Sequence, residues 1–132
     1  MNRAICIALV FSVAIVDWSM AADLAYTCQV THVYEITPDG SLVTSSLEKQ
    51  IKSSSFSVSR VTGEIIGEVL PTMLARSTRV VNQGSKEYSF KAVADFGEHF
   101  QLLEVQEFRE GAIKPFVASS MGGAGIVTGV CK

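Results

Sequence analysis

Two cysteines near opposite ends of the chain constrain its fold more than any other feature of the sequence. Cys28 follows an apolar N-terminal segment, and Cys131 is the penultimate residue. A disulfide between them requires Cα atoms within about 4.4–6.8 Å of each other. If both cysteines lie on strands, the first and last strands must be neighbours or must face each other. The chain is therefore expected to form either a closed barrel or a sandwich.

The N-terminal segment has the pattern of a secretory signal peptide. Arg3 supplies a positive charge, residues 4–16 form a mostly apolar run, and Ser19-Met20-Ala21 offers small residues for cleavage after Ala21. The apolar run is too short to cross a bilayer, which takes about 20 residues. We interpret residues 1–21 as a signal peptide and residues 22–132 as one exported domain, periplasmic or extracellular, with no transmembrane span.

Export places the remaining cysteines in an oxidising compartment, where two cysteines usually pair. Neither Cys28 nor Cys131 belongs to a Cys-x-x-Cys motif or has a histidine beside it that would lower a thiol pKa. A redox or metal-binding role is therefore disfavoured. We predict a structural disulfide, Cys28–Cys131, that encloses nearly the whole domain.

Composition and charge argue against two classes of binding partner. The 132 residues fit a single domain, and 48% of them are hydrophobic, so the chain is not disordered. Eleven basic residues face 13 acidic ones, for a net charge of −2, and the basic residues are scattered. Binding to nucleic acid or to an anionic membrane is therefore not expected.

Alternation of apolar and polar residues predicts strands. Over Ala25–Ile36 the even positions are mostly apolar and the odd positions mostly polar, which is typical of a half-buried strand. His32 falls on the apolar face and is expected to be partly buried there. The apolar members of this face are Tyr26, Cys28, Val30, Tyr34 and Ile36.

Turn signals separate further strand patterns, and together they predict an all-β fold. We expect a single-domain antiparallel meander of about eight or nine strands, a closed barrel or a sandwich, with at most one or two short helical turns. Residues 45–55 fit a short helix or a polar loop equally well, and residues 72–77 are expected to form a helical turn. The later strands are expected at residues 41–44, 55–60, 65–69, 78–82, 86–95, 100–109, 113–119 and 126–131.

Few residues have the spacing that catalysis or metal binding requires. His99 lies near Asp95 and Glu98 in sequence, which permits an enzyme that uses His99 with one of these carboxylates. The same three residues match no standard set of metal ligands, and a solvated turn is the simpler interpretation. No nucleophile elbow and no phosphate-binding glycine motif is present. No cofactor or metal is expected.

The two ends of the exported domain carry a limited resemblance. Tyr26-x-Cys28 and Gly129-x-Cys131-Lys132 resemble the ends of small exported bacterial β-proteins, including some periplasmic lysozyme inhibitors. The resemblance covers these two short segments, and no fold, activity or site residue is carried over from it.

A binding or inhibitory module of the cell envelope, without enzymatic activity, is therefore the leading hypothesis. Its partner would be a protein, bound by loops on a rigid β scaffold. The alternative is a lipocalin-like carrier of a small apolar ligand, lined by Phe56, Phe90, Phe100 and Phe116. The candidate contact residues lie in three loops: Asp39, Gly40, Phe96, Glu98, His99, Gly122 and Gly123.

Overall fold

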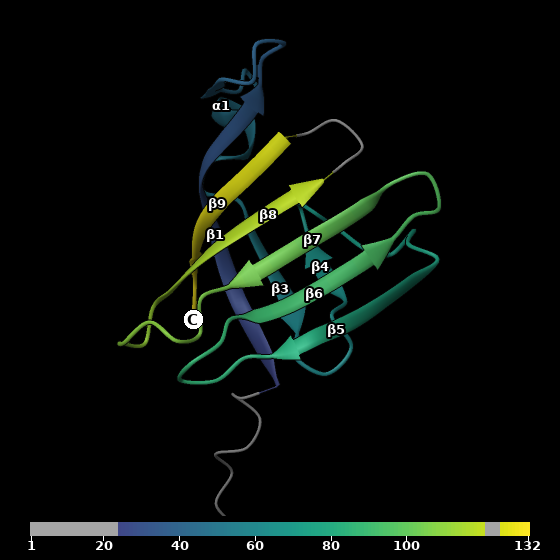
Figure 1. Ribbon diagram of the computed structural model, residues 1–132, viewed down its shortest axis with the longest axis vertical. Helices are drawn as coiled ribbons and strands as arrows, with labels where there is room; N and C mark the ends of the chain where they lie inside the picture. The colour runs from purple at the N-terminus through teal and green to yellow at the C-terminus, as the bar shows by residue number, and fades with distance from the viewer. Residues whose placement is uncertain (1–23, 121–124) are drawn as a thin grey trace, which may run out of the picture.

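The computed structural model describes residues 24–120 and 125–132, which form one antiparallel sheet of nine strands (Figure 1). Strands account for 53% of the structure and helix for 4%, which confirms the all-β class. The signal-peptide prediction for residues 1–21 and the candidate residues Gly122 and Gly123 lie outside the described residues. The elements are β1 Ala25–Ile36, β2 Leu42–Thr44, α1 Glu48–Ile51, β3 Ser55–Ser59, β4 Ile65–Gly67, β5 Ser77–Gln83, β6 Phe90–Asp95, β7 Phe100–Val105, β8 Lys114–Ser120 and β9 Gly125–Cys131.

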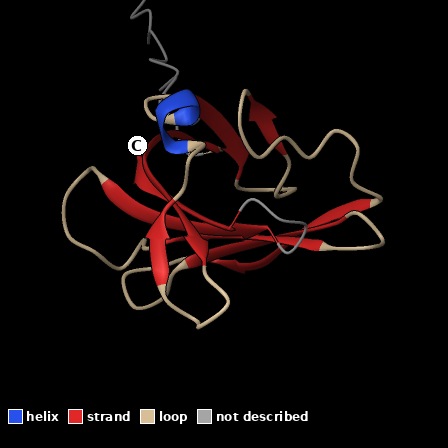
Figure 2. Ribbon diagram, turned by 90° about the horizontal axis from the view of Figure 1, so that it is seen from above, coloured by secondary structure: helices blue, strands red, loops and turns tan. Residues whose placement is uncertain are grey.

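The strands β5 to β9 form a meander in which each strand pairs with the next. β9 then pairs with β1, and the other side of β1 pairs with β3 and with the short β2. β4 lies beyond β3, so β4 and β5 are the two ends of the strand order. The sheet curls into a half-barrel (Figures 1 and 2), an arrangement between the closed barrel and the sandwich that the sequence predicted.

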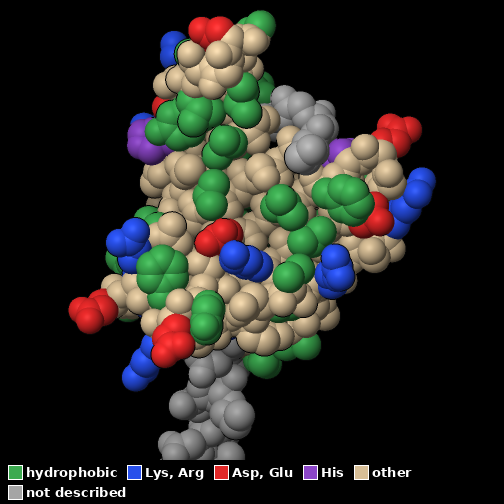
Figure 3. Space-filling model, in the orientation of Figure 1, with side chains coloured by type: hydrophobic (Ala, Val, Ile, Leu, Met, Phe, Trp, Pro, Cys, Tyr) green, Lys and Arg blue, Asp and Glu red, His purple; other side chains and the backbone are tan. Residues whose placement is uncertain are grey.

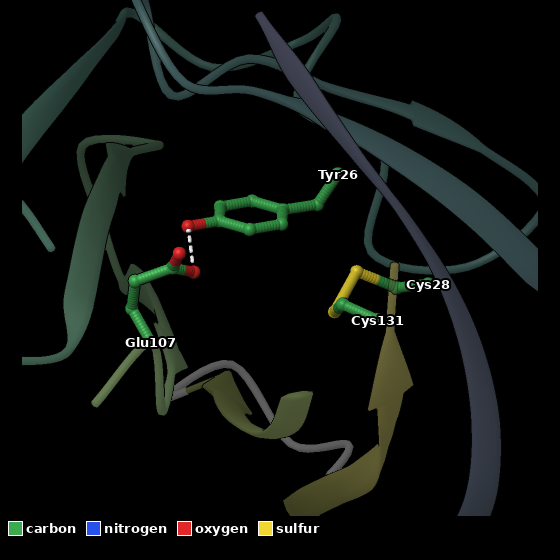
Figure 4. The surroundings of a disulfide bond; sticks show 4 residues. All are labelled: Tyr26, Cys28, Glu107 and Cys131. Atoms are coloured by element: carbon green, nitrogen blue, oxygen red, sulfur yellow. Dashed lines mark hydrogen bonds between the residues drawn. A yellow bond between two sulfur atoms is a disulfide. The ribbon is translucent and has the colours of Figure 1, made fainter. Parts of the chain in front are cut away.

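The predicted disulfide joins the first and last strands. Cys28 and Cys131 are bonded to each other and are register partners between β1 and β9. The next pair, Thr27 and Lys132, exchanges two backbone hydrogen bonds of 2.9 Å. The cysteines therefore occupy a non-hydrogen-bonded site, where the Cα atoms of facing residues come closest. Both cysteines are buried, and Figure 4 shows the bond beside Tyr26.

The core fills the concave side of the sheet. Phe56 packs edge-on against Phe116, and Tyr26 packs edge-on against Phe90, with 5.2 Å between the ring centroids of each pair. Aromatic pairs of this geometry contribute about 0.5–1.5 kcal/mol beyond the area that they bury. The other buried hydrophobic residues include Val30, Val33, Val58, Ile65, Ala92, Leu103, Val105, Ala118 and Val127.

The β3–β4 hairpin lies behind β6 and β7 in Figure 1 and closes the concave side. At its turn, a Cβ on Gly63 would lie 3.1 Å from the Arg79 backbone and 3.1 Å from the Ala92 side chain. These close distances, together with a positive φ of 75° at Gly63, favour glycine where the hairpin approaches β5 and β6. The curl of the sheet therefore depends on contact between its two halves as well as on strand pairing.

A β-bulge in β1 corrects the predicted orientation of His32. The register with β9 shifts between Val30 and His32, so Val33 takes the inward position that alternation had assigned to His32. A bulge adds one residue to one strand and exchanges the two faces beyond it. His32 is consequently exposed instead of partly buried, and Ile36 is exposed as well.

The stretch that the sequence left open, residues 45–55, contains one helical turn, α1. The Ser45 hydroxyl accepts a hydrogen bond from the Leu47 N–H at 3.2 Å. The Glu48 carboxylate does not close a capping box with Ser45; it accepts the Val33 N–H at 3.0 Å. Glu48 of α1 therefore supplies β1 with a hydrogen-bond acceptor next to the bulge.

Two further strand predictions need correction. β6 begins at Phe90, because residues 85–88 form a turn closed by a 2.9 Å bond from the Ser85 N–H to the Tyr88 carbonyl, which leaves Tyr88 exposed. β7 ends at Val105, four residues before the end of the strand predicted at residues 100–109. Its register with β6 and β8 is regular, and Phe100 and Leu102 lie exposed on the outer face.

The outer face of β5 to β8 faces the viewer in Figure 3, where hydrophobic side chains gather between charged ones. A shallow depression on it is lined by Val81, Val93, Leu102 and Val117, among others. Lys91 and Glu104 approach each other to 3.9 Å at its border. Within the described ranges, no helix is long and apolar enough to cross a membrane.

Candidate functional site

Two of the three predicted contact loops leave the sheet at the same end. The Thr37–Ser41 turn follows the last residue of β1, and the Phe96–His99 turn connects β6 to β7. Pairing of Asp95 with Phe100, and of Tyr34 with Ile126, aligns these strand ends along one rim, the upper one in Figure 1. Three strands, β9, β8 and β7, separate β1 from β6, so the structure does not bring the two turns together.

Hydrogen bonds inside the Thr37–Ser41 turn occupy the Asp39 carboxylate. It accepts the Thr37 hydroxyl, and it accepts the Ser41 N–H and hydroxyl at 3.2 Å each. These bonds, that from Thr37 first, hold the pKa of the Asp39 carboxyl below its ordinary value. The Gly40 N–H donates to the Thr37 carbonyl at 2.8 Å. Asp39 therefore fixes the shape of the turn.

The Phe96–His99 turn is also ordered by its own groups. The Phe96 N–H donates to the His99 carbonyl at 3.0 Å, and the Gly97 N–H donates to Asp95 Oδ1 at 2.7 Å. The Phe96 and His99 rings are stacked, with centroids 4.7 Å apart and planes 8° apart. Gly97 adopts a positive φ of 89°, which favours glycine. Glu98 is exposed at the tip.

This geometry gives no support to the alternative of an enzyme built on His99. The His99 ring lies on Phe96, and Asp95 directs a carboxylate oxygen to a backbone N–H, whereas a general base needs a carboxylate or substrate partner within hydrogen-bond distance. Among the described residues, no group of three or more His, Cys, Asp or Glu side chains is placed to hold a metal ion.

The segment Glu68–Arg76, which connects β4 to β5, packs against the Phe96–His99 turn. The Arg76 N–H donates to the Asp95 carbonyl at 2.6 Å. The Arg76 guanidinium covers Gly97 so closely that a Cβ at that position would overlap it. We call the Glu68–Arg76 segment and the Phe96–His99 turn together the loop surface.

Buried polar contacts hold the Glu68–Arg76 segment in place. The buried Thr72 hydroxyl accepts the Ile65 N–H at 2.8 Å, and the buried Gln101 amide donates to the Leu70 carbonyl at 2.8 Å. Leu70 has a left-handed backbone with φ of 56°, an uncommon conformation for this residue type. The helical turn predicted for residues 72–77 is absent; a tight turn replaces it, closed by a 2.9 Å bond from the Ala75 N–H to the Thr72 carbonyl.

Met73 and Leu74 form the tip of this segment, and neither was among the predicted contact residues. Their exposed fractions are 80% and 82%, the largest of the exposed large hydrophobic residues in the described part of the chain. The available signal was a pair of consecutive apolar residues after Pro71, in a break between two strands. Sequence alone could not show that both side chains point away from the core.

The four phenylalanines proposed to line a ligand cavity do not face one space. Phe56, Phe90 and Phe116 are buried in the core, where each packs against another aromatic ring. Phe100 lies on the opposite face of the sheet and is 49% exposed. The positions of these four residues therefore do not support a carrier of a small apolar ligand.

The arrangement of the loop surface is what the fold offers for recognition: two ordered loops in contact, with an apolar tip on one and a stacked aromatic pair on the other. Ordered loops on a rigid sheet commonly carry binding function. Comparison of the chain with protein-family models, curated proteins and solved structures found no match.

Proposed function

We propose that this protein is a non-enzymatic binding or inhibitory module exported to the cell envelope, and that the loop surface contacts its protein partner. One observation carries the proposal. The Phe96–His99 turn and the Glu68–Arg76 segment, distant in sequence, are fixed against each other through Arg76. A surface that is ordered before binding loses less conformational entropy when a partner binds.

Two features support export. The pattern of residues 1–21 is that of a signal peptide, and the Cys28–Cys131 disulfide would be unusual in a reducing compartment. The mass of the protein purified from its own secretory compartment tests this part. We expect a chain that begins at Ala22 and is lighter by two hydrogens than the reduced form. Retention of Met1 or free thiols would contradict it.

Site-specific crosslinking tests the contact surface. A photoreactive benzoylphenylalanine replaces Glu98 on the loop surface or Glu110, an exposed control in the β7–β8 connection at the opposite end of the sheet. We expect one protein of the envelope to crosslink from position 98 and not from position 110. Equal crosslinking from both positions, or none from position 98, would reject the loop surface.

The crosslinked protein is then identified by mass, purified and titrated with the wild-type chain and with Arg76→Ala. Arg76→Ala keeps the backbone bond to Asp95 but removes the guanidinium that covers Gly97 within the loop surface, and we expect binding at least about tenfold weaker. Lys86→Ala, an exposed position at the opposite end, is the control and is expected to bind as wild type. Unchanged binding by Arg76→Ala would contradict the assignment.

A further inference from the structure

Met73 and Leu74 are more exposed than apolar side chains of their size usually are. They are consecutive, 80% and 82% exposed, and they lie at the tip of a loop and not on the face of a strand. Isolated exposed hydrophobic residues need no explanation, but two adjacent ones on a protruding turn present a convex apolar surface to solvent.

The backbone on both sides of the tip is fixed. On one side the Thr72 hydroxyl bonds to the Ile65 N–H, and on the other the Arg76 N–H bonds to the Asp95 carbonyl. The bond from the Ala75 N–H to the Thr72 carbonyl closes the turn between these anchors. The tip is thus held in one backbone conformation, and only the Met73 and Leu74 side chains need to be ordered on binding.

We propose that Met73 and Leu74 are the anchor pair that the loop surface inserts into a concave apolar pocket of a folded protein partner; this inference rests on the proposed function. Interfaces gain most of their affinity from a few side chains that fill such pockets, and methionine is enriched at interfaces. A convex, ordered pair of apolar side chains fits a preformed pocket of complementary shape.

The charges of the loop surface favour a protein over a lipid surface. The two loops that form the loop surface carry two acidic residues, Glu68 and Glu98, and one basic residue, Arg76. Loops that insert into anionic membranes usually carry clusters of lysine or arginine beside their apolar residues. The loop surface has no such cluster and carries an excess of acidic residues, which is unfavourable for that role and matches a pocket with a basic rim.

The test compares a tip variant with a matched control. Met73→Ser/Leu74→Ser removes the apolar anchors, whereas Ile66→Ser changes a residue that is 70% exposed on β4, outside the loop surface. Both variants are titrated against the purified protein that crosslinks from position 98. We expect binding at least about 30-fold weaker for the tip variant and within about twofold of wild type for Ile66→Ser. The melting temperatures of both should stay near that of wild type, because neither site is packed in the core.

Each of the other outcomes would contradict the assignment of Met73 and Leu74 as anchors, and each would show which part of the proposal is wrong. If the tip variant binds as wild type while Arg76→Ala does not, the anchor is wrong and the proposed function stands. If no protein crosslinks from position 98, the proposed function fails and the anchor with it. Two results would reassign the tip: binding of wild type, but not the tip variant, to phosphatidylglycerol vesicles, or loss of self-association by the tip variant in sedimentation. The first would indicate a lipid surface and the second another copy of this chain.

Discussion

The contact between Tyr26 and Glu107 joins the start of β1 to the segment that connects β7 to β8. The Tyr26 hydroxyl, at the end of the ring that points away from the disulfide (Figure 4), donates to Glu107 Oε2 at 2.6 Å, and the ring is buried. The Arg60 guanidinium lies over the ring, 4.7 Å from its centroid. Burial first, and then the hydrogen bond to Glu107, raise the pKa of Tyr26 well above its ordinary value. One phenol therefore joins two segments that no strand pairing connects.

Removal of this hydroxyl should weaken the fold. Tyr26→Phe leaves the ring in place and takes away a hydrogen bond to a charged group, so we expect the free energy of unfolding to fall by about 1.5 kcal/mol. Urea denaturation at neutral pH measures it. Tyr88→Phe, at an exposed tyrosine, is the control and should change nothing. Equal effects of the two substitutions would show that the bond to Glu107 contributes no stability.

The raised pKa of Tyr26 also predicts how the stability of the fold changes at alkaline pH. Because the folded pKa of Tyr26 lies above that of the unfolded chain, near 10, its contribution is complete below pH 10 and is lost as the pH rises through the folded pKa. The difference in unfolding free energy between wild type and Tyr26→Phe should therefore shrink above pH 10, by up to about 1.4 kcal/mol per pH unit. A difference that stays constant up to pH 12 would contradict the assignment. Tyr34 and Tyr88 are present in both proteins, so their contributions drop out of this difference in free energy.

At the scale of the element, β1 contains a backbone N–H whose hydrogen bond is accepted by a side chain and not by a neighbouring strand. Next to the bulge, the Glu48 carboxylate takes the Val33 N–H that a neighbouring strand would otherwise bind, and the Ser45 N–H bonds to the Val33 carbonyl at 2.9 Å. His32 Nδ1 lies 3.6 Å from the same carboxylate. The bond from Val33, as the largest cause, holds the pKa of Glu48 below its ordinary value.

Two substitutions at Glu48 should separate the effect of its hydrogen-bond acceptor from the effect of its negative charge. Glu48→Ala leaves the Val33 N–H without its acceptor and is expected to lower the melting temperature more than Glu48→Gln, which keeps an oxygen. Lys49→Ala, on the exposed side of α1, is the control. Because the folded pKa of Glu48 is depressed, wild type should lose stability relative to Glu48→Gln as the pH falls through that pKa. Parallel acid denaturation of the two proteins would contradict this role.

The elements differ in how well the sequence predicts them. Alternation and turn residues locate all nine strands, because half-buried strands must alternate and tight turns need residues such as Gly97. The bulge before His32 leaves no compositional signal, since one extra residue only moves side chains to the other face. The turn at Phe96–His99 was predictable, but its contact with Arg76 is a tertiary one and has no local pattern.

At the scale of the whole molecule, the disulfide closes a loop with a sequence separation of 103 residues. A crosslink of this span removes conformational freedom mainly from the unfolded chain, and in the entropy model its loss costs about 4.7 kcal/mol. We expect Cys28→Val/Cys131→Val, which keeps apolar side chains in the core, to lose about 2–4 kcal/mol in urea denaturation. Reductant should destabilise wild type similarly and leave the variant unchanged. A smaller effect would mean that β1 and β9 also associate in the unfolded chain.

The position of β9 also determines when the sheet can be completed during synthesis. β9 is the last described strand in the chain, yet it lies in the interior of the sheet, between β1 and β8. A nascent chain that has reached Ser120 holds β1 and β8 with no strand between them, so their facing edges stay open until the final segment follows. We expect a chain stopped at Ser120 to show rapid amide exchange throughout β1, whereas slow exchange there would mean that the first half folds by itself. If the protein is exported as we propose, the pairings of β9 with β1 and β8 would form only after the C-terminal segment has crossed the membrane.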